Sequence, residues 1–240
     1  MNALSIRNVS KRFRGLQAVQ SLSFDVPGGA IVALIGPNGA GKTTTFNLIA
    51  GAMRPDQGEI CLDDLRLDGL SPHRICAAGI ARTFQLVRPF GELSVEDNIL
   101  IGCLRVEHQV ADARAAARAI IDRLGLTDQR TRPAASLTLP DRKRLEVARA
   151  LGTRPRVLLL DEVMAGLTPS ECDELVAFFR EINRDFRVTI LLIEHIMRAV
   201  MALASRVVVL NYGEKIAEGT PTSVMRDPAV LQCYLGEDTV

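Results

Sequence analysis

The segment Gly36-Pro37-Asn38-Gly39-Ala40-Gly41-Lys42-Thr43 constrains the fold of this chain more than any other stretch. It follows the apolar run IVALI and precedes the helix-forming run TTTFNLIA, and it matches the whole pattern G-x-x-x-x-G-K-[ST] in the strand–turn–helix context that confirms such a match. The glycines let backbone N–H groups close around phosphate oxygens, Lys42 brings charge to the β- and γ-phosphates, and the Thr43 hydroxyl can ligate Mg²⁺. A glycine-rich turn without a ligand is the alternative. The motif predicts a nucleotide site, and residues 36–43 are called the phosphate loop below.

The composition narrows the class of protein. The chain has 240 residues, 48% of them hydrophobic and 24% charged, which is ordinary for a globular protein with a sizeable core. The formal charge of +1, from 29 basic and 28 acidic residues, gives no field that would attract nucleic acid, so no nucleic-acid partner is expected. Five scattered cysteines without a C-x-x-C pair argue against a disulfide framework or a zinc site and for a reducing compartment. No apolar run approaches the ~20 residues that span a bilayer, so at a membrane other chains would hold this one.

The order of apolar and amphipathic runs predicts an α/β fold with buried parallel strands. Between about residues 86 and 154 the runs are all helical in period, with Gly or Pro between them. We therefore expect one domain in which 1–85 and 155–240 form a nucleotide-binding core and 86–154 forms a helical subdomain. The expected strands are 3–8, 18–26, 31–36, 59–64, 79–84, 156–162, 188–195, 206–211 and 213–219; the expected helices are 43–50, 71–78, 94–104, 110–126, 139–151, 169–184 and 196–204, with two short ones after them.

Two carboxylates, Asp161 and Glu162, end the apolar strand RVLLLDE. The carboxyl end of a parallel strand faces the ligand crevice. There Asp161 can hold the Mg²⁺ shell, and Glu162 can polarise a water molecule aimed at the γ-phosphate. An acidic turn after a strand is common, and the neighbouring phosphate loop is what favours a functional role.

His195 and Gln85 stand at the ends of two other predicted strands, VTILLIEH and GIARTF. Alone, a histidine at a strand end is usually structural, and an amide there is usually a turn residue. The phosphate loop and the acidic strand end favour a role for both in the same site.

The stretch SLTLPDRKRLEVARAL, residues 136–151, allows two interpretations. Thr138 and Asp141 have the spacing of an N-terminal capping box, and Pro140 falls in the first turn, where its missing N–H costs little. It is therefore a well-made helix start. A helix N-terminus is also a natural anion site, so the same residues could face a phosphate.

Taken in order, the phosphate loop, Gln85, the 136–151 stretch, Leu158–Glu162, Ala165–Thr168 and His195 resemble the ATP-binding subunits of ABC transporters. The resemblance covers nearly the whole chain. It implies a P-loop NTPase (RecA-like) core with an antiparallel β subdomain and an inserted helical subdomain. It also implies ATP and Mg²⁺ as cofactors, a composite dimer with a second ATPase subunit, transmembrane permease subunits, and a peripheral position on the cytoplasmic face of the inner membrane.

The resemblance also assigns roles to single residues. Phe13 matches the aromatic residue that stacks on adenine, which is more often Tyr. Gln85 matches the residue that contacts Mg²⁺ and the attacking water and couples to the membrane subunits, and His195 matches the histidine on the γ-phosphate. Thr168 stands where the family usually has Asp. The implied catalytic residues are Glu162, His195 and Gln85, the nucleotide-binding residues are Phe13, Gly36, Asn38, Gly39, Ala40, Gly41, Lys42, Thr43 and Thr44, and the metal-binding residues are Thr43, Gln85 and Asp161.

The same alignment places Leu137–Asp141, LTLPD, at the family's signature, usually LSGGQ, which presents a hydroxyl and N–H groups to the γ-phosphate across the dimer. Thr138 can replace the serine. Leu139 adds a side chain where the pattern has none, and Pro140 has no N–H. We call Leu137–Asp141 the signature segment. Its departures predict a heterodimer with two unequal ATP sites, with a homodimer as the alternative.

Within the family, residues 82–102, 165–171 and 193–221 are similar to branched-chain amino acid uptake systems. That similarity implies an importer with two ATPase subunits, two membrane subunits and, indirectly, a periplasmic binding protein. The segment 86–102 opens the helical insertion, and its run LVRPFGEL has apolar side chains beside a Pro and a Gly. We therefore expect Gln85 and 86–102 to meet a membrane subunit. The alternatives are the ATPase of a lipid or polysaccharide exporter, a soluble ABC ATPase acting on ribosomes or DNA, and a small-molecule phosphotransferase. Tandem cassettes or a long coiled-coil insertion would indicate the soluble ABC ATPase. An Arg-rich lid would indicate the phosphotransferase.

Overall fold

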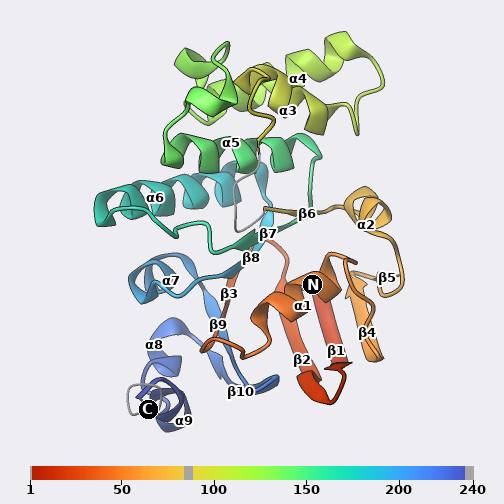
Figure 1. Cartoon of the computed structure of the whole chain (residues 1–240), viewed down its shortest axis with the longest axis vertical. Coiled ribbons are helices and arrows are strands. Elements are labelled where there is room, and N and C mark those ends of the chain that lie inside the picture. Colours follow the sequence, from red (N-terminus) through yellow and green to blue (C-terminus); the bar gives the residue numbers. More distant parts are fainter. Residues whose placement is uncertain (1, 84–88, 236–240) are drawn as a thin grey trace.

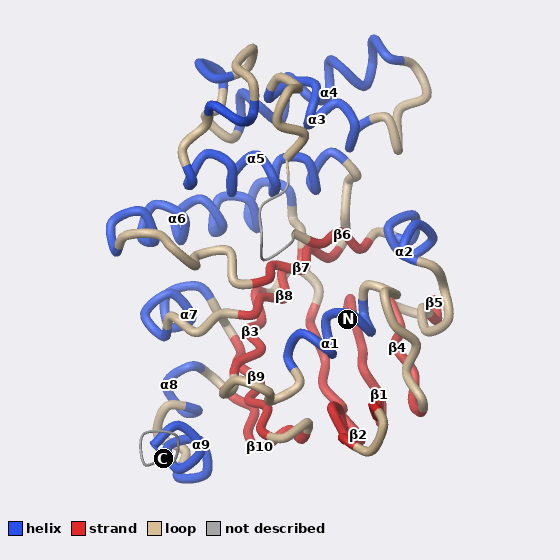
Figure 2. Tube along the Cα trace, viewed as in Figure 1, coloured by secondary structure: helices blue, strands red, loops and turns tan. Residues whose placement is uncertain are grey.

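The computed structural model describes residues 2–83 and 89–235. Figure 1 shows two β-sheets side by side in the lower half of the molecule and a group of helices above them. Figure 2 separates the helical part from the strands by colour. In the part of the chain that the structure describes, none of the helices has the length and apolar character needed to cross a membrane.

The smaller sheet is antiparallel, with strand order β2-β1-β4-β5. Its strands are β1 (Asn2–Phe13), β2 (Leu16–Pro27), β4 (Gln57–Leu62) and β5 (Leu65–Arg66). Buried and more exposed residues alternate along it: Leu4 and Ile6 of β1 are fully buried, whereas Ser5 and Arg7 are half-buried. This alternation is typical of a sheet with one face on a core and one toward solvent.

The larger sheet has strand order β10-β9-β3-β8-β7-β6 and is parallel except for β10. Every residue of β3 (Ile31–Ile35), β7 (Val157–Asp161) and β8 (Thr189–Ile193) is buried. Strands covered on both faces need such continuous apolar runs. The remaining strands are β6 (Ile80–Arg82), β9 (Arg206–Asn211) and β10 (Glu214–Gly219).

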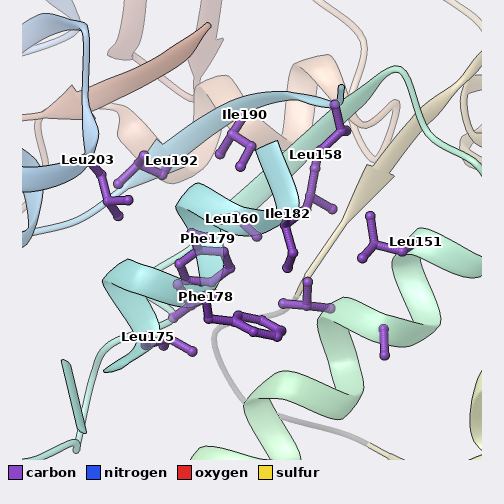
Figure 3. Packing of buried hydrophobic residues seen from close by; sticks show 14 of the residues in the cluster. Leu151, Leu158, Leu160, Leu175, Phe178, Phe179, Ile182, Ile190, Leu192 and Leu203 are labelled. Atoms are coloured by element: carbon purple, nitrogen blue, oxygen red, sulfur yellow. The ribbon is translucent and has the colours of Figure 1, made fainter. Parts of the chain in front are cut away.

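Alternate residues of these strands belong to two different hydrophobic clusters, because successive side chains point to opposite faces. Leu158, Leu160, Ile190 and Leu192 face α6 (Pro169–Phe186) and α7 (Met197–Leu203). Figure 3 shows Phe178, Phe179 and Ile182 of α6 between those strand residues and Leu151 of α5 (Leu139–Gly152). The opposite face, with Val32, Leu34, Leu159 and Leu191, packs on α1 (Lys42–Ile49) and on the antiparallel sheet. The parallel sheet is thus the middle layer of the core.

The helices above the sheet are α3 (Val95–Cys103), α4 (Val110–Arg123) and α5 (Leu139–Gly152), with 3₁₀ turns at Thr127–Gln129 and Ala134–Ser136. α3 and α5 approach closely: a Cβ atom on Gly102 would lie 2.2 Å from the Arg149 carbonyl oxygen. Buried residues of all three helices belong to the same hydrophobic cluster as the buried residues of α6. The domain boundaries at 86 and 154 therefore stay a prediction, because packing is continuous from these helices to the sheet.

The predicted strands and helices are present, with shifted ends. The strand expected at 59–64 lies at Gln57–Leu62, because Asp63 has a φ of 47° and turns the chain toward β5, which the sequence did not predict. The short helices are α2 (Pro72–Ala78), α8 (Pro221–Val224) and α9 (Pro228–Leu235). Element ends depend on local turns that hydrophobic periodicity does not report.

Candidate nucleotide-binding site

Three predicted segments meet at one edge of the parallel sheet. The phosphate loop follows β3, Asp161 and Glu162 lie at the end of β7, and His195 follows β8. These strands are neighbours in the order β3-β8-β7, and Ile193 of β8 is paired with Leu34 on one side and Asp161 on the other. The carboxyl edge of a parallel sheet is where ligands of such folds bind.

The phosphate loop depends on its glycines. Gly36 and Gly41 have φ angles of 148° and 101°, and a Cβ atom would lie 2.1 Å from the Leu210 carbonyl oxygen at Gly36 and 2.4 Å from that of Ala18 at Gly41. α1 begins at Lys42, and the N–H groups of a first helical turn have no partners inside the helix. The Lys42 ammonium donates hydrogen bonds to the carbonyl oxygens of Gly36 (2.6 Å) and Pro37 (2.8 Å). The loop therefore presents N–H groups and a cation to the same space.

A cavity of about 360 Å³ adjoins this loop. Phe13, which is 39% exposed, lines it together with Glu162. The structure thus brings three predicted parts of the site to one cavity: Phe13, expected to stack on adenine, the phosphate loop, and Glu162, expected to polarise the attacking water. Gly36, Asp161 and His195 are described but do not line it, and Gln85 lies outside the described residues. The lining residues are Phe13, Leu16, Gln17, Ala18, Asn38, Gly39, Ala40, Gly41, Lys42, Thr43, Thr44, Glu162 and Tyr212.

Glu162 has a left-handed backbone, with a φ of 47°. Its N–H donates to the carbonyl oxygen of Ile193 at 3.0 Å, which ties the turn after β7 to the end of β8. A bulky residue rarely adopts this conformation, and such strain is often found at functional sites. The turn aims the half-buried Glu162 at the cavity beside the phosphate loop.

Asp161 is buried and forms an ion pair that the sequence did not predict. Its Oδ2 accepts a hydrogen bond from Nη2 of Arg82 at 2.7 Å, while Nη1 of Arg82 donates to Oδ1 of Asn47 at 2.6 Å. The guanidinium also lies over the Phe46 ring, 5.8 Å from its centroid. Arg82 therefore connects β6, β7 and α1. A basic residue at the end of a predicted strand was the available signal, but its partners depend on strand order.

Glu194 and Lys143 form a second buried polar group that the sequence did not predict. Glu194 is 1% exposed, and its Oε1 accepts a hydrogen bond from the Met164 N–H at 2.9 Å. Burial raises the pKa of Glu194. Burial also lowers the pKa of Lys143 in α5, and the carboxylates of Glu194 and Glu146 act in the opposite direction. The neighbouring His195 is exposed at the sheet edge.

The signature segment forms the N-terminus of α5. Thr138 is the N-cap: its hydroxyl accepts from the Asp141 N–H at 3.4 Å and donates to Asp141 Oδ2 at 2.8 Å. Pro140 lies in the first turn, and Leu139 is 41% exposed. The helix-start interpretation is confirmed. The signature segment does not line the cavity of its own chain, and its role toward a phosphate stays a prediction.

The oxygen donors near the phosphate loop fit Mg²⁺. The Thr43 hydroxyl is exposed at the cavity and Asp161 supplies a carboxylate at the adjoining strand end, and Mg²⁺ prefers such oxygen ligands together with phosphates and water. No cluster of three or more His, Cys, Asp or Glu suited to a metal occurs among residues 2–83 and 89–235. A phosphate-loop site does not require one, because the nucleotide supplies further ligands.

Comparisons with known proteins agree with this geometry. A model of the ABC transporter family matches residues 19–165, and a model of the branched-chain amino acid ATP-binding cassette transporter matches 214–240. The high-affinity branched-chain amino acid transport ATP-binding protein LivG of Escherichia coli (strain K12) is 41% identical over 98% of both chains. The lipopolysaccharide export system ATP-binding protein LptB of the same strain is 35% identical over 99% of both. The crystal structure of the ADP conformation of MJ1267, an ATP-binding cassette of an ABC transporter, superposes with a TM-score of 0.89 at 29% identity, covering 98% of this chain and 99% of that one.

The fold and the phosphate-loop edge define an ATPase of the ATP-binding cassette class, in which ATP hydrolysis is coupled to transport. The chain belongs to the ABC transporter family and, within it, to the LivG-like type of ATP-binding protein.

Proposed function

We propose that this chain binds and hydrolyses ATP to energise the import of branched-chain amino acids. The match of residues 214–240 to the branched-chain amino acid transporter model carries this choice of substrate, because the chain as a whole is also similar to an export ATPase, over 99% of its length. Identity to LivG, 41% against 35% for LptB, points the same way.

In the proposed mechanism adenine stacks on Phe13 while the N–H groups of Gly39–Thr44 and the Lys42 ammonium bind the phosphates. Thr43, Asp161 and Gln85 are the residues that would hold Mg²⁺, which neutralises phosphate charge when bound. Glu162 polarises the attacking water and accepts its proton. The cavity beside the phosphate loop supports the roles of Phe13, Lys42 and Glu162, and the adjoining strand end supports that of Asp161. The role of Gln85, which lies outside the described residues, is what the resemblance to the family implies.

Lys42→Ala tests the site. The variant loses the cation that the phosphate loop holds close, and a hydrogen bond to a charged group is worth about 1.5–3 kcal/mol, so ATP affinity should fall roughly 10- to 100-fold. Calorimetric titration of the purified chain with Mg²⁺-ATP measures the change. Affinity equal to that of the unmodified chain would contradict the site assignment.

The substrate is tested by transport. The chain, assembled with its membrane subunits and binding protein in vesicles, should support ATP-dependent uptake of radiolabelled leucine, isoleucine or valine, and Lys42→Ala should abolish that uptake. Full ATPase activity without uptake of any of the three would count against an amino acid substrate. Extraction of lipopolysaccharide in the same vesicles would favour the export alternative.

A largely apolar groove of about 510 Å³ lies between the α2–β6 segment and helices α3 and α5. Its walls include Ile75, Ile80, Arg82 and Ile101. Arg82 comes three residues before Gln85, and Ile101 belongs to the 86–102 segment predicted to meet a membrane subunit. We propose that a helical segment of the permease occupies this groove, which would keep the chain peripheral, on the cytoplasmic face of the inner membrane.

Ile101→Glu tests the docking. Ile101 is 41% exposed at the groove, and a charge there would be desolvated by a docked apolar segment. Co-purification with the membrane subunits should fall tenfold or more. Val110→Glu, on a 58% exposed residue of α4 outside the groove, is the matched control and should assemble normally. Equal assembly of both variants would exclude this groove as the contact, and ATP titration of each isolated variant checks that the nucleotide site is intact.

The second ATPase subunit is proposed from the position of the signature segment. Thr138 and Leu139 are exposed at the start of α5 and do not line the cavity of their own chain. A phosphate that they contact would therefore belong to a nucleotide bound by a partner, either a different subunit or a second copy of this chain.

A further inference from the structure

Tyr212 is the most exposed large hydrophobic side chain among the described residues, at 84%. It lines the same cavity as Phe13 and the phosphate loop. It also lines a second cavity of about 430 Å³ between the phosphate loop and α9. Tyr212 therefore borders the nucleotide cavity on the side of the C-terminal helix.

The backbone at Tyr212 is unfavourable for its residue type. Tyr212 and Gly213 form the two-residue turn between β9 and β10, with φ angles of 46° and 83°. Hairpin turns with two left-handed residues favour Asn-Gly or Asp-Gly, because a bulky side chain is disfavoured in that region. An exposed aromatic residue in this position contributes little to the core and costs conformational energy, a combination that suggests a role in binding.

The turn is fixed against the phosphate loop. The Gly213 N–H donates to the Ala40 carbonyl oxygen at 3.0 Å, and the Gly213 carbonyl oxygen accepts from the Gln20 N–H at 2.8 Å. A Cβ atom on Gly213 would lie 3.0 Å from the Ala18 carbonyl oxygen. Ala18 lines the same cavity as Phe13 and Tyr212. The position of Tyr212 is therefore set by contacts of its turn with the phosphate loop and with β2.

We propose that Tyr212 is a nucleotide-contacting residue whose ring packs against the adenosine part of the bound nucleotide, as a second aromatic surface besides Phe13. The proposal rests on the ATP site proposed above. Because the contact is made at the adenosine end, Tyr212 contributes equally to the binding of ATP and ADP. The strained turn is retained because it places this ring.

Tyr212→Asn separates the effect of this residue on the stability of the fold from its effect on nucleotide affinity. Asparagine adopts the left-handed conformation readily, so the melting temperature of the nucleotide-free chain should rise by a few degrees. The ring is lost, so the affinities for Mg²⁺-ATP and Mg²⁺-ADP should both fall by about two- to tenfold, the size of an aromatic contact. Tyr212→Phe keeps the ring and should bind both nucleotides with nearly unchanged affinity.

Arg187→Asn is the matched control. Arg187 is an exposed residue with a φ of 51° at the end of α6, and it does not line the nucleotide cavity. It should raise the melting temperature without changing nucleotide affinity. Unchanged affinity in Tyr212→Asn, or a loss of ATP affinity without a matching loss for ADP, would overturn the proposal. If Lys42→Ala weakens binding while Tyr212→Asn does not, the proposed ATP site survives and only the role of Tyr212 fails.

The chain has two tyrosines and no tryptophan, which provides a spectroscopic test. In Tyr234→Phe the remaining tyrosine is Tyr212, and its fluorescence should change on saturation with ADP, because the ring enters contact with the nucleotide. In Tyr212→Phe the remaining tyrosine is Tyr234 of α9, which serves as the reference for light absorbed by the nucleotide. Identical responses from the two variants would contradict the contact.

Discussion

At the scale of single residues, Asp161 and Glu162 are adjacent in sequence but differ in their surroundings, because Asp161 is buried and paired with Arg82 whereas Glu162 lines the cavity. Lys42, Thr43, Asp161 and Glu162 were predictable, since a contiguous pattern and a strand end specify them, and the structure places three of them at the cavity. The roles of Arg82, Glu194 and Tyr212 were not predictable, because each depends on contacts with residues distant in sequence, as Arg82 does on its ion pair with Asp161. Side-chain pairing across a sheet follows from strand order, and periodicity does not encode strand order.

Glu194→Gln is a prediction at this scale. The folded chain raises the pKa of Glu194 above its ordinary 4.5, so it retains a proton that the unfolded chain has released, and stability falls as pH rises from 4.5 through the raised value. Glutamine resembles the protonated acid and avoids this loss. The charged groups facing Glu194 are Lys143, His195 and Glu162. The gain in melting temperature of the variant should be larger at pH 8 than at pH 5 by about 2–4 °C.

A matched comparison uses Glu171, whose pKa is lowered by hydrogen bonds from the Thr168 backbone and hydroxyl. The stability it contributes is present above pH 4.5 and is lost as pH falls through the lowered pKa. The loss of melting temperature in Glu171→Gln should therefore be the same at pH 5 and pH 8 and should shrink only below pH 4.5. A pH-independent difference between Glu194→Gln and the unmodified chain would contradict the raised pKa of Glu194.

At the scale of elements, the sequence predicted most accurately the strands whose position is decided by the burial of apolar side chains. The runs IVALI, VLLLD and TILLI are buried strands because four or five consecutive apolar residues require cover on both faces. The short strand β5 escaped prediction, since it is made of two exposed residues placed by a turn. The N-terminus of α5 shows a mixed case, in which the cap at Thr138 was predictable and its relation to a phosphate was not.

Leu139→Gly and Pro140→Ala are predictions for that helix start. The first removes a side chain that is 41% exposed beside Gly166, and the second restores an N–H donor in the first turn. Each should raise the ATP turnover of the reconstituted transporter, since a hydrogen bond to a charged group is worth about 1.5–3 kcal/mol. Leu139→Gly should also lower the melting temperature slightly, because glycine costs ~1 kcal/mol in a helix. Unchanged turnover in the double variant would show that the signature segment does not limit hydrolysis.

At the scale of the whole molecule, the layered core followed from the alternation of strands and helices. The order β10-β9-β3-β8-β7-β6 did not, and this order brings the phosphate loop, Glu162 and His195 to one edge. The assembly with other subunits is harder to predict from the sequence than the fold, because the signature segment is separate from the cavity of its own chain. In the dimer proposed above, a complete site depends on the signature sequence of the partner subunit.

Glu162→Gln tests that dependence. The amide cannot accept the proton of the attacking water, so ATP should stay bound and the ATP-bound dimer with the partner subunit should accumulate, visible by size-exclusion chromatography. If the signature segment of this chain is weak and that of the partner is intact, the site built on Lys42, Glu162 and His195 of this chain carries most of the turnover. Glu162→Gln in this chain should then remove most ATPase activity of the reconstituted transporter, whereas the same change in the partner subunit should remove little. Equal losses from the two substitutions would mean that the two sites turn over equally despite Leu139 and Pro140. A Glu162→Gln chain that stays monomeric in the presence of ATP and its partner would contradict the composite site.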